Sequence, residues 1–291
     1  MPSRFVSLVI LVYWSVAAFF LLTWDVIPEL TLGNAPDLRA IIVAGDSSKP
    51  VRWNIEVIDD PRFPDLRRTV GEAVTGLSRK PHGWTELTSQ VEVDAAGLLK
   101  GNPHLGRSPS LRLKIESVYR VDPTGNLKSF NLEVKSRDST ETLIVVKGEV
   151  KEKKMEIVSR GPVEFFNRKL SIDYLPRSVV QDVLGPLDRL PGLHVGQKWD
   201  TQVINPFTAR VEEVRVEVTR KDLIHWNGDA VRAFEVVQKA KLSSISLRTW
   251  VNFDGVILRQ EVPTPFVRLM MERRADVDEE IPKLPTRVPG P

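Results

Sequence analysis

A run of apolar residues near the amino terminus sets the strongest limit on how this chain can fold. Residues Phe5 to Trp24 (FVSLVILVYWSVAAFFLLTW) carry no charge, and about 20 such residues are the length that a helix needs to cross the hydrocarbon core of a bilayer. In lipid the run has to be helical, because its backbone N–H and C=O groups can bond only within the segment. It therefore predicts a transmembrane helix that binds the lipid bilayer and anchors the chain.

The charges beside this run predict its orientation. Arg4 and the amino terminus precede it, whereas Asp25 and Glu29 follow it. Cationic flanks stay on the cytoplasmic side, and Trp24 at the end of the run suits the membrane interface. We therefore expect a single-pass protein of the bacterial inner membrane, with the N-terminus inside and the main domain extracytoplasmic.

Two other interpretations of the run are open. A cleaved signal peptide would use the small residues Val16-Ala17-Ala18, but the apolar run continues through Phe19 to Leu22, past the usual h-region of roughly 7–15 residues. A buried core helix of a soluble domain would have a polar face at helical spacing, and the run has none. The retained anchor is the favoured interpretation.

Beyond the run, alternation of apolar and polar residues predicts β-strands. Val51 to Ile58 alternates Val, Trp, Ile and Val with Arg, Asn and Glu, which is typical of a half-buried strand. Asp122 to Asn126 (DPTGN) separates two such runs, and proline followed by glycine suits the φ angles of a hairpin turn. The further predicted strands are Arg67–Arg79 (with a helix over Arg67–Leu77 as the alternative), Trp84–Val93, Leu111–Val121, Leu127–Val134, Thr142–Val150, Lys154–Val158, Leu170–Tyr174, Lys198–Val203, Arg210–Thr219, Ala230–Ala240, Ser244–Asn252, Gly255–Val262 and Phe266–Ala275, the last being a strand or a short helix.

These elements predict a mainly β fold, in which the transmembrane helix is followed by an antiparallel, strongly curved sheet or half-barrel. One or two short helices are expected, one of them around Val179 to Leu184. The chain divides into a cytoplasmic tip and anchor (1–28), a juxtamembrane linker (29–50), an extracytoplasmic β-rich domain (51–275) and an acidic, proline-rich tail (276–291) that predicts disorder. Faint echoes between 51–160 and 161–275 indicate two halves of one continuous curved sheet.

Composition excludes several classes of protein. Lys and Arg exceed Asp and Glu by only 41 − 38 = 3, and the basic stretch Lys147 to Lys154 (KGEVKEKK) is interrupted by glutamates, so no nucleic-acid partner is expected. The chain has no cysteine, which removes disulfides, thiolate metal sites and thiol nucleophiles.

No residue pattern indicates catalysis, a metal or a cofactor, and we expect the protein not to be an enzyme. The four histidines (His82, His104, His194 and His225) have no metal-site spacing. The serines lie in no nucleophile motif, and no glycine-rich phosphate loop is present. The adjacent carboxylates Asp59-Asp60, Glu212-Glu213 and Glu279-Glu280 would point to opposite faces of a strand. A carboxylate pair assembled from distant strands stays open.

Five tryptophans lie on or beside the predicted strands. They are Trp53, Trp84, Trp199, Trp226 and Trp250. Such residues can line an apolar cavity inside a curved sheet, or they can simply fill its core. Core packing is the favoured interpretation, because the sequence does not distinguish a filled barrel from a hollow one.

Two short stretches carry a family resemblance. At Val195-Gly196-Gln197-Lys198-Trp199, and at Trp250-Val251-Asn252 followed by Gly255 and Leu258-Arg259-Gln260-Glu261, the chain resembles the uncharacterised periplasmic β-rich domains that accompany bacterial transglutaminase-like proteins. The resemblance covers Thr142 to Arg274, and it implies a curved, half-open barrel similar to those of periplasmic lipoprotein and lipid carriers. The transglutaminase cysteine is absent, so the resemblance implies no catalysis and assigns no ligand residue.

Together these features predict a membrane-anchored extracytoplasmic binding or scaffolding module. It would hold an apolar ligand or dock an envelope protein by strand addition. One alternative is an envelope-polymer hydrolase with a carboxylate pair from distant strands. Another is an accessory subunit of a membrane complex, contacted through the anchor helix.

Overall fold

The computed structural model describes residues 12–19, 36, 39, 42–43, 49–58, 66–94, 112–137, 142–174, 180–182, 187–205, 210–240, 246–263 and 268–275. Its strands are β1 (Val51–Ile58), β2 (Arg67–Arg79), β3 (Thr85–Asp94), β4 (Arg112–Val121), β5 (Leu127–Ser136), β6 (Thr142–Lys151), β7 (Lys154–Arg160), β8 (Arg168–Asp173), β9 (Val180–Asp182), β10 (Lys198–Asn205), β11 (Arg210–Trp226), β12 (Asp229–Ala240), β13 (Ser246–Asn252), β14 (Ile257–Pro263) and β15 (Arg268–Arg273). Two 3₁₀ turns accompany them, η2 (Pro81–Gly83) and η3 (Glu164–Phe166).

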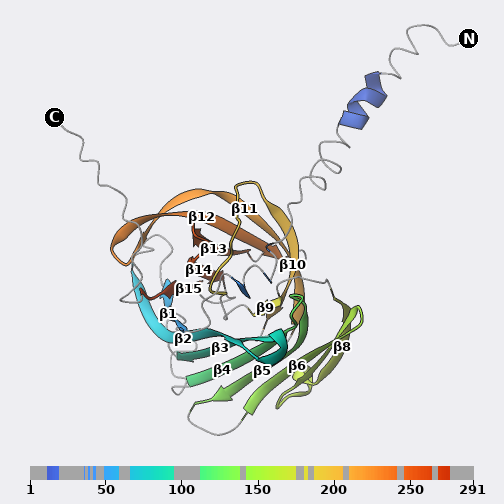
Figure 1. The fold of residues 1–291 in the computed structure, drawn as a ribbon, viewed down its shortest axis with the longest axis vertical. Helices are drawn as coiled ribbons and strands as arrows, with labels where there is room; N and C mark the ends of the chain where they lie inside the picture. The colour runs from blue at the N-terminus through green and yellow to red at the C-terminus, as the bar shows by residue number, and fades with distance from the viewer. Residues whose placement is uncertain are drawn as a thin grey trace, which may run out of the picture.

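All fifteen strands form one curved sheet (Figure 1), in the order β8-β7-β6-β5-β4-β3-β2-β1-β15-β14-β13-β12-β11-β10-β9. Strands β1 to β8 make one antiparallel meander and β10 to β15 make another; β9 is the exception, because it pairs with β10 in parallel. In the described part of the chain the sheet is not closed, since β8 and β9 each have a neighbour on one side only. The expected mainly β fold with one large antiparallel sheet is confirmed.

The two meanders meet where the first strand pairs with the last. Trp53 and Ile55 of β1 lie opposite Arg273 and Met271 of β15. Residues from both 51–160 and 161–275 therefore belong to one sheet. This joint brings together segments more than 200 residues apart in sequence.

Inward-facing side chains of both meanders form the main hydrophobic core. The alternation in β1 places Trp53, Ile55 and Val57 inside, where Trp53 and Val57 have no exposed surface. Leu132 of β5 and Val218 of β11 are equally buried in the same cluster. Each such side chain contributes about 1.5–3 kcal/mol through its removal from water, so this core is the main source of stability.

A glycine on β6 shows how closely this core is packed. Gly148 lies opposite Phe130 of β5, and a Cβ atom added at Gly148 would stand 1.9 Å from a ring carbon of Phe130. The Phe130 ring also stacks on Tyr119 of β4, with 5.9 Å between ring centroids. The aromatic ring therefore occupies the space that a side chain at position 148 would need.

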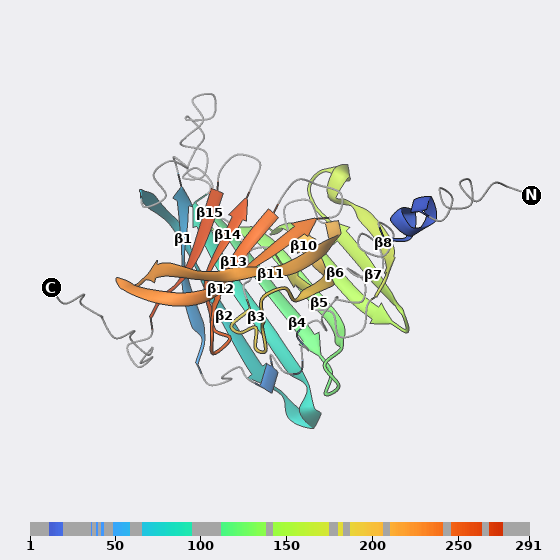
Figure 2. The same cartoon turned by 90° about the horizontal axis from the view of Figure 1, so that it is seen from above.

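A second hydrophobic cluster lies on the outer face of the sheet. Strands β11 and β12 are long, and a shift in their register at Val218/Arg220 marks a bulge of the kind that bends a hairpin. Figure 2 shows this hairpin crossing β14 and β15. Its tip contributes Trp226 and Ile224, which cluster with Leu258 of β14 and Met270 of β15.

Four segments differ from the sequence prediction or settle an alternative. Residues 180–182 form β9 rather than part of a helix, because prolines at 176 and 186 leave too few residues for a stable helix while β10 offers backbone partners. Strand β11 continues to Trp226 instead of ending at Thr219. Arg67–Arg79 and Arg268–Arg273 are strands, not helices.

Only residues 12–19 of the predicted anchor are described, and they are helical. Among the described residues, no helix combines the length and the apolar character that crossing a bilayer requires. Figure 1 shows this helix away from the sheet, and Figure 2 gives the same arrangement from above, with the helix on the side of β8. In the linker, residues 39, 42 and 43 are helical. The rest of Phe5–Trp24 and the tail 276–291 lie outside the described residues.

Candidate functional site

The five tryptophans proposed as cavity-lining residues do not come together. Trp53 and Trp199 belong to the inner core, whereas Trp226 and Trp250 belong to the cluster on the outer face. Trp84 lies near the β2–β3 turn, is 38% exposed and lines a pocket of about 160 Å³ beside η2. In the described interior of the sheet, the tryptophans pack as core residues. The binding of an apolar ligand stays a prediction.

The other residues considered from sequence are scattered. His82 has a positive φ of 63° in η2, and His194 and His225 are exposed. The described residues contain no group of three or more histidine or acidic side chains arranged to hold a metal ion. His104, Asp59-Asp60 and Glu279-Glu280 lie outside the described part of the chain, and so does the side chain of Glu212.

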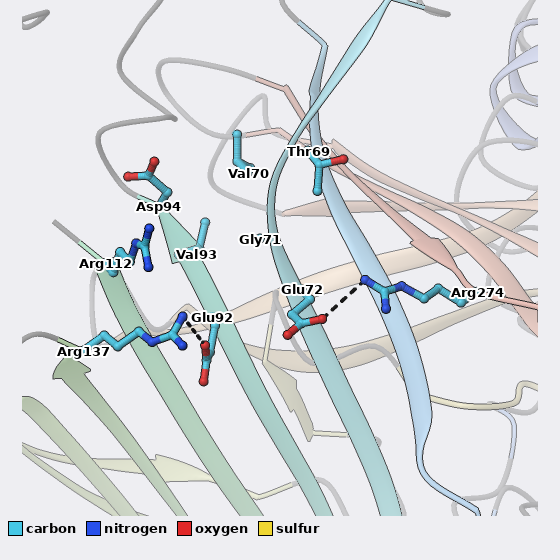
Figure 3. A pocket seen from close by; sticks show the side chains of 10 residues that line it. All are labelled: Thr69, Val70, Gly71, Glu72, Glu92, Val93, Asp94, Arg112, Arg137 and Arg274. Carbon is cyan, nitrogen blue, oxygen red and sulfur yellow. Dashed lines mark hydrogen bonds and ion pairs between the residues drawn. The ribbon is translucent and has the colours of Figure 1, made fainter. Parts of the chain in front are cut away.

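A polar pocket of about 310 Å³ opens on the outer face where β2, β3 and β4 begin or end (Figure 3). Glu72 of β2 pairs with Arg274 at 3.3 Å, and Glu92 of β3 pairs with Arg137 at 2.9 Å. Gly71 lines its floor, where a Cβ atom would lie 2.1 Å from the carbonyl oxygen of Glu92. The close approach of β2 and β3 therefore requires glycine there.

Two carboxylates from adjacent strands lie opposite each other in this pocket, as the open hydrolase alternative requires. Glu72 and Glu92 are directly opposite each other on adjacent strands, which places their Cβ atoms about 4.5–5.5 Å apart. Each carboxylate is paired with a guanidinium, Glu72 with Arg274 and Glu92 with Arg137. Glu72 and both arginines are also 41–52% exposed, so water screens these charges.

A less exposed ion network fixes the β11–β12 tip beside this region. Glu272 of β15 accepts from Arg259 at 2.9 Å and from Arg67 at 2.6 Å, and Arg67 also lies 3.5 Å from Glu56. Burial lowers the pKa of Arg259 below its usual value, and Glu272 opposes that shift. Arg259 donates to the carbonyl oxygen of His225 at 2.5 Å. The network therefore joins the sheet to the hairpin that covers it.

The outer face of β2 to β7 is a ladder of matched charges. Lys135 lies 2.8 Å from both Glu116 and Glu133, and its hydrogen bonds to Glu116 and Glu133 raise the pKa of Lys135. Shallow grooves of about 340 and 480 Å³ cross this face and share Val118 and Asn131. Such a face is solvated and presents no concentrated charge.

The open edge of the sheet offers a different kind of site. Four of the six residues of β8 are exposed, namely Lys169, Leu170, Ser171 and Asp173. Leu170 is 37% exposed although its position points inward. An exposed edge strand presents unpaired backbone donors and acceptors, and another chain can pair with them.

The hydrogen-bond pattern shows which groups of β8 face outward. The Tyr174 N–H donates to the carbonyl oxygen of Lys153 at 2.8 Å. In an antiparallel ladder bonded pairs alternate, so Ile172 and Leu170 also bond to β7. Lys169 and Ser171 then direct their N–H and C=O groups away from β7. Both have exposed side chains and no interaction other than the ladder in the described structure.

Comparisons with known proteins identify no family. No family model and no curated protein matches the chain. Among solved structures, a β-barrel-like protein of the domain of unknown function DUF1849 from Brucella abortus is similar, with 9% identity, a TM-score of 0.49 and coverage of 77% of this chain and 94% of that one. A DUF1089 family protein from Pseudomonas aeruginosa has 14% identity, a TM-score of 0.35 and coverage of 67% and 90%.

A third structure, from Bacteroides fragilis, has a YmcC-like fold and is provisionally described as an exported protein. It has 9% identity and a TM-score of 0.30, over 83% of this chain and 97% of that one. At these scores the three structures carry no argument about function. None of them is described as an associate of transglutaminases; that association stays a prediction.

Proposed function

We propose that this protein is a membrane-anchored, extracytoplasmic binding or scaffolding module that docks an extended segment of an envelope protein by strand addition at β8. The observation that carries the proposal is the open edge, where the backbone groups of Lys169 and Ser171 point away from β7 and have no partner among the residues that the structure describes. Strand addition uses such groups for affinity and the alternating side chains for specificity.

The exposed apolar helix supports the anchoring part of the proposal. Within Phe5–Trp24, the described side chains Val12, Tyr13, Trp14 and Phe19 are 53–70% exposed. Large apolar side chains exposed together mark a site of contact with a membrane or a partner. The uncharged length of the whole run favours the membrane.

A proline at the edge tests the docking site. Ser171→Pro removes an N–H that points away from β7, so the ladder to β7 stays intact and proline is tolerated as it is on other edge strands. Ser171→Ala is the matched control, because it removes only the hydroxyl. A photoreactive residue at Leu170 is expected to form an adduct in living cells, and this adduct should be lost with Ser171→Pro and kept with Ser171→Ala.

Both variants should unfold in urea within about 1 kcal/mol of the parent, since neither loses a ladder bond. Undiminished adduct in a folded Ser171→Pro protein would contradict docking at this edge. Absence of any adduct above that from a photoreactive residue at Thr88, an exposed position on β3, would contradict it as well.

The hydrolase is a second candidate, favoured by one observation, the opposed Glu72 and Glu92 in the polar pocket. If it holds, the full-length protein cleaves an envelope polysaccharide, and both Glu72→Gln and Glu92→Gln abolish turnover. Glu149→Gln, at a residue whose side chain is 64% exposed, is the control and should leave turnover unchanged. No cleavage by the unaltered protein would eliminate this candidate.

A further inference from the structure

We infer that the segment docked at β8 is the β8 strand of a second copy of this chain, paired antiparallel about Ser171. The inference rests on the proposed role of β8 as a docking edge and names its partner. It follows from the order of charges along the strand, from the direction of its backbone groups and from its exposed leucine.

The side chains of β8 are complementary to themselves when the strand is turned end for end. With Ser171 at the two-fold axis, Lys169 of one copy faces Asp173 of the other, and the same contact recurs on the other side of the axis. Both residues are exposed and lie on the outer face of the sheet. Asp173 also has a contact within its own copy, and a carboxylate can accept from more than one donor. Opposite charges directly across an antiparallel pair are favourable, whereas like charges are unfavourable.

The backbone accepts this register. Hydrogen-bonded pairs in an antiparallel ladder join residues whose N–H and C=O groups both face the partner strand. In β8 these are residues of odd number, including Lys169 and Ser171, because Leu170 and Ile172 bond to β7. Centring the pair on Ser171 joins Ser171 to Ser171 and Lys169 to Asp173, so the bonding positions coincide. If the register shifted by one residue, each residue whose N–H and C=O groups face the partner would lie opposite a residue whose groups already bond to β7.

Registers shifted by two or more residues differ from this one in which charged side chains face each other. Centring the pair on Leu170 would face Lys169 with Ser171, and centring it on Lys169 would face two lysines with each other. Centring it on Asp173 would face two aspartates with each other. Only the pairing about Ser171 joins a lysine to an aspartate.

The inner side of the strand adds an apolar contact. In the same register Leu170 of one copy faces Ile172 of the other, and Ile172 already lies against the inner core. The 37% of Leu170 that is exposed in one copy would then be covered. A two-fold pair uses the same surface twice and closes on itself, so the edge becomes unavailable for further strands. Anchoring both copies in one membrane would raise their effective concentration.

Disulfide trapping tests the register directly, because the chain has no cysteine of its own. In a hydrogen-bonded pair the two Cα atoms lie about 5.5 Å apart, within the roughly 4.4–6.8 Å that a disulfide spans. Ser171→Cys in the full-length membrane protein is expected to give a cross-linked species of twice 32.9 kDa under mild oxidation. Thr88→Cys, exposed on β3 away from the edge, is the control and should stay monomeric.

Charge reversal tests the lysine–aspartate contact. Lys169→Asp alone should weaken dimerisation roughly tenfold, because it creates two like-charge contacts per dimer, and Asp173→Lys alone should do the same. The double variant Lys169→Asp/Asp173→Lys restores the pairing and is expected to recover dimerisation in sedimentation measurements. Circular dichroism verifies that each variant keeps its sheet.

Two results would overturn the inference: Ser171→Cys cross-linking no faster than Thr88→Cys, or a folded double reversal that does not recover dimerisation. If these occur while Ser171→Pro still removes an adduct from position 170, docking at β8 stands and its partner is a different protein. If the adduct is also insensitive to Ser171→Pro, the proposed function fails together with the inference.

Discussion

The carboxylate of Asp122 organises the turn between β4 and β5. Its Oδ1 atom accepts from the backbone N–H groups of Thr124 and Asn126, each at 2.9 Å, and from the Thr124 hydroxyl at 2.6 Å. Burial on its own would raise the pKa of Asp122, but the hydrogen bonds from Thr124, Asn126 and Lys128 outweigh it and lower the pKa below its usual value. The turn was predicted from its proline and glycine, whereas this role of the carboxylate was not.

Because the pKa of Asp122 is lowered in the folded state, the free energy of unfolding depends on pH in a direction that can be stated. A carboxylate whose pKa is lower in the folded state stabilises the fold above its unfolded pKa, which is about 4, and loses that contribution as the pH falls through the folded value. Asp122→Asn should therefore reduce the free energy of unfolding by about 1 kcal/mol at neutral pH, and the gap should narrow as the pH falls below about 4. Urea titrations of both proteins across this range measure the gap. A gap that is independent of pH would contradict this role.

Single residues also show where sequence reasoning stops. Trp53 and Trp226 both occur in strand-like sequence, and both are almost fully buried. They nevertheless lie on opposite faces of the sheet. The burial of Trp226 depends on a hairpin that bends back over β14 and β15, and no local alternation encodes that bend.

At the scale of elements, the β11–β12 hairpin acts as a cover. Trp226 packs at its tip and donates its Nε1–H to the carbonyl oxygen of Arg273 at 3.0 Å. Trp226→Ala should cost about 3–5 kcal/mol and release the tip. We expect faster proteolytic cleavage at the turn Asn227-Gly228 and a lower urea midpoint. Leu223→Ala is the control, since Leu223 is 58% exposed on the same strand and should change neither. Cleavage of Trp226→Ala at the parent rate would show that the tip is held by other contacts.

Most strands could be predicted because each has apolar residues on one face and polar residues on the other. The bounds of β1 and β2 coincide with their alternating runs. The alternation of apolar and polar residues did not predict structure that depends on distant partners. Residues of β9 form a strand because β10 lies beside them. Strand β11 is longer than predicted because its end packs against another layer.

At the scale of the whole molecule, strand order decides where a partner can bind. The sequence predicted one curved antiparallel sheet, yet it did not show that the first strand pairs with the last. That pairing places β1 at the centre and leaves β8 at an edge. The sequence predicted a strand at Leu170–Tyr174. It did not predict that this strand lies at an edge, because the strand order depends on pairing between distant segments.

Residue-resolved amide hydrogen exchange tests the open edge most directly. It is best measured on Lys169→Asp protein, at a concentration where sedimentation shows single copies. The structure predicts that the Ser171 amide exchanges rapidly, whereas the amides of Leu170 and Ile172 are protected by their bonds to β7. Equal protection of all three amides in the single copy would show that another segment already covers β8, and it would contradict the proposal that this edge receives a partner strand.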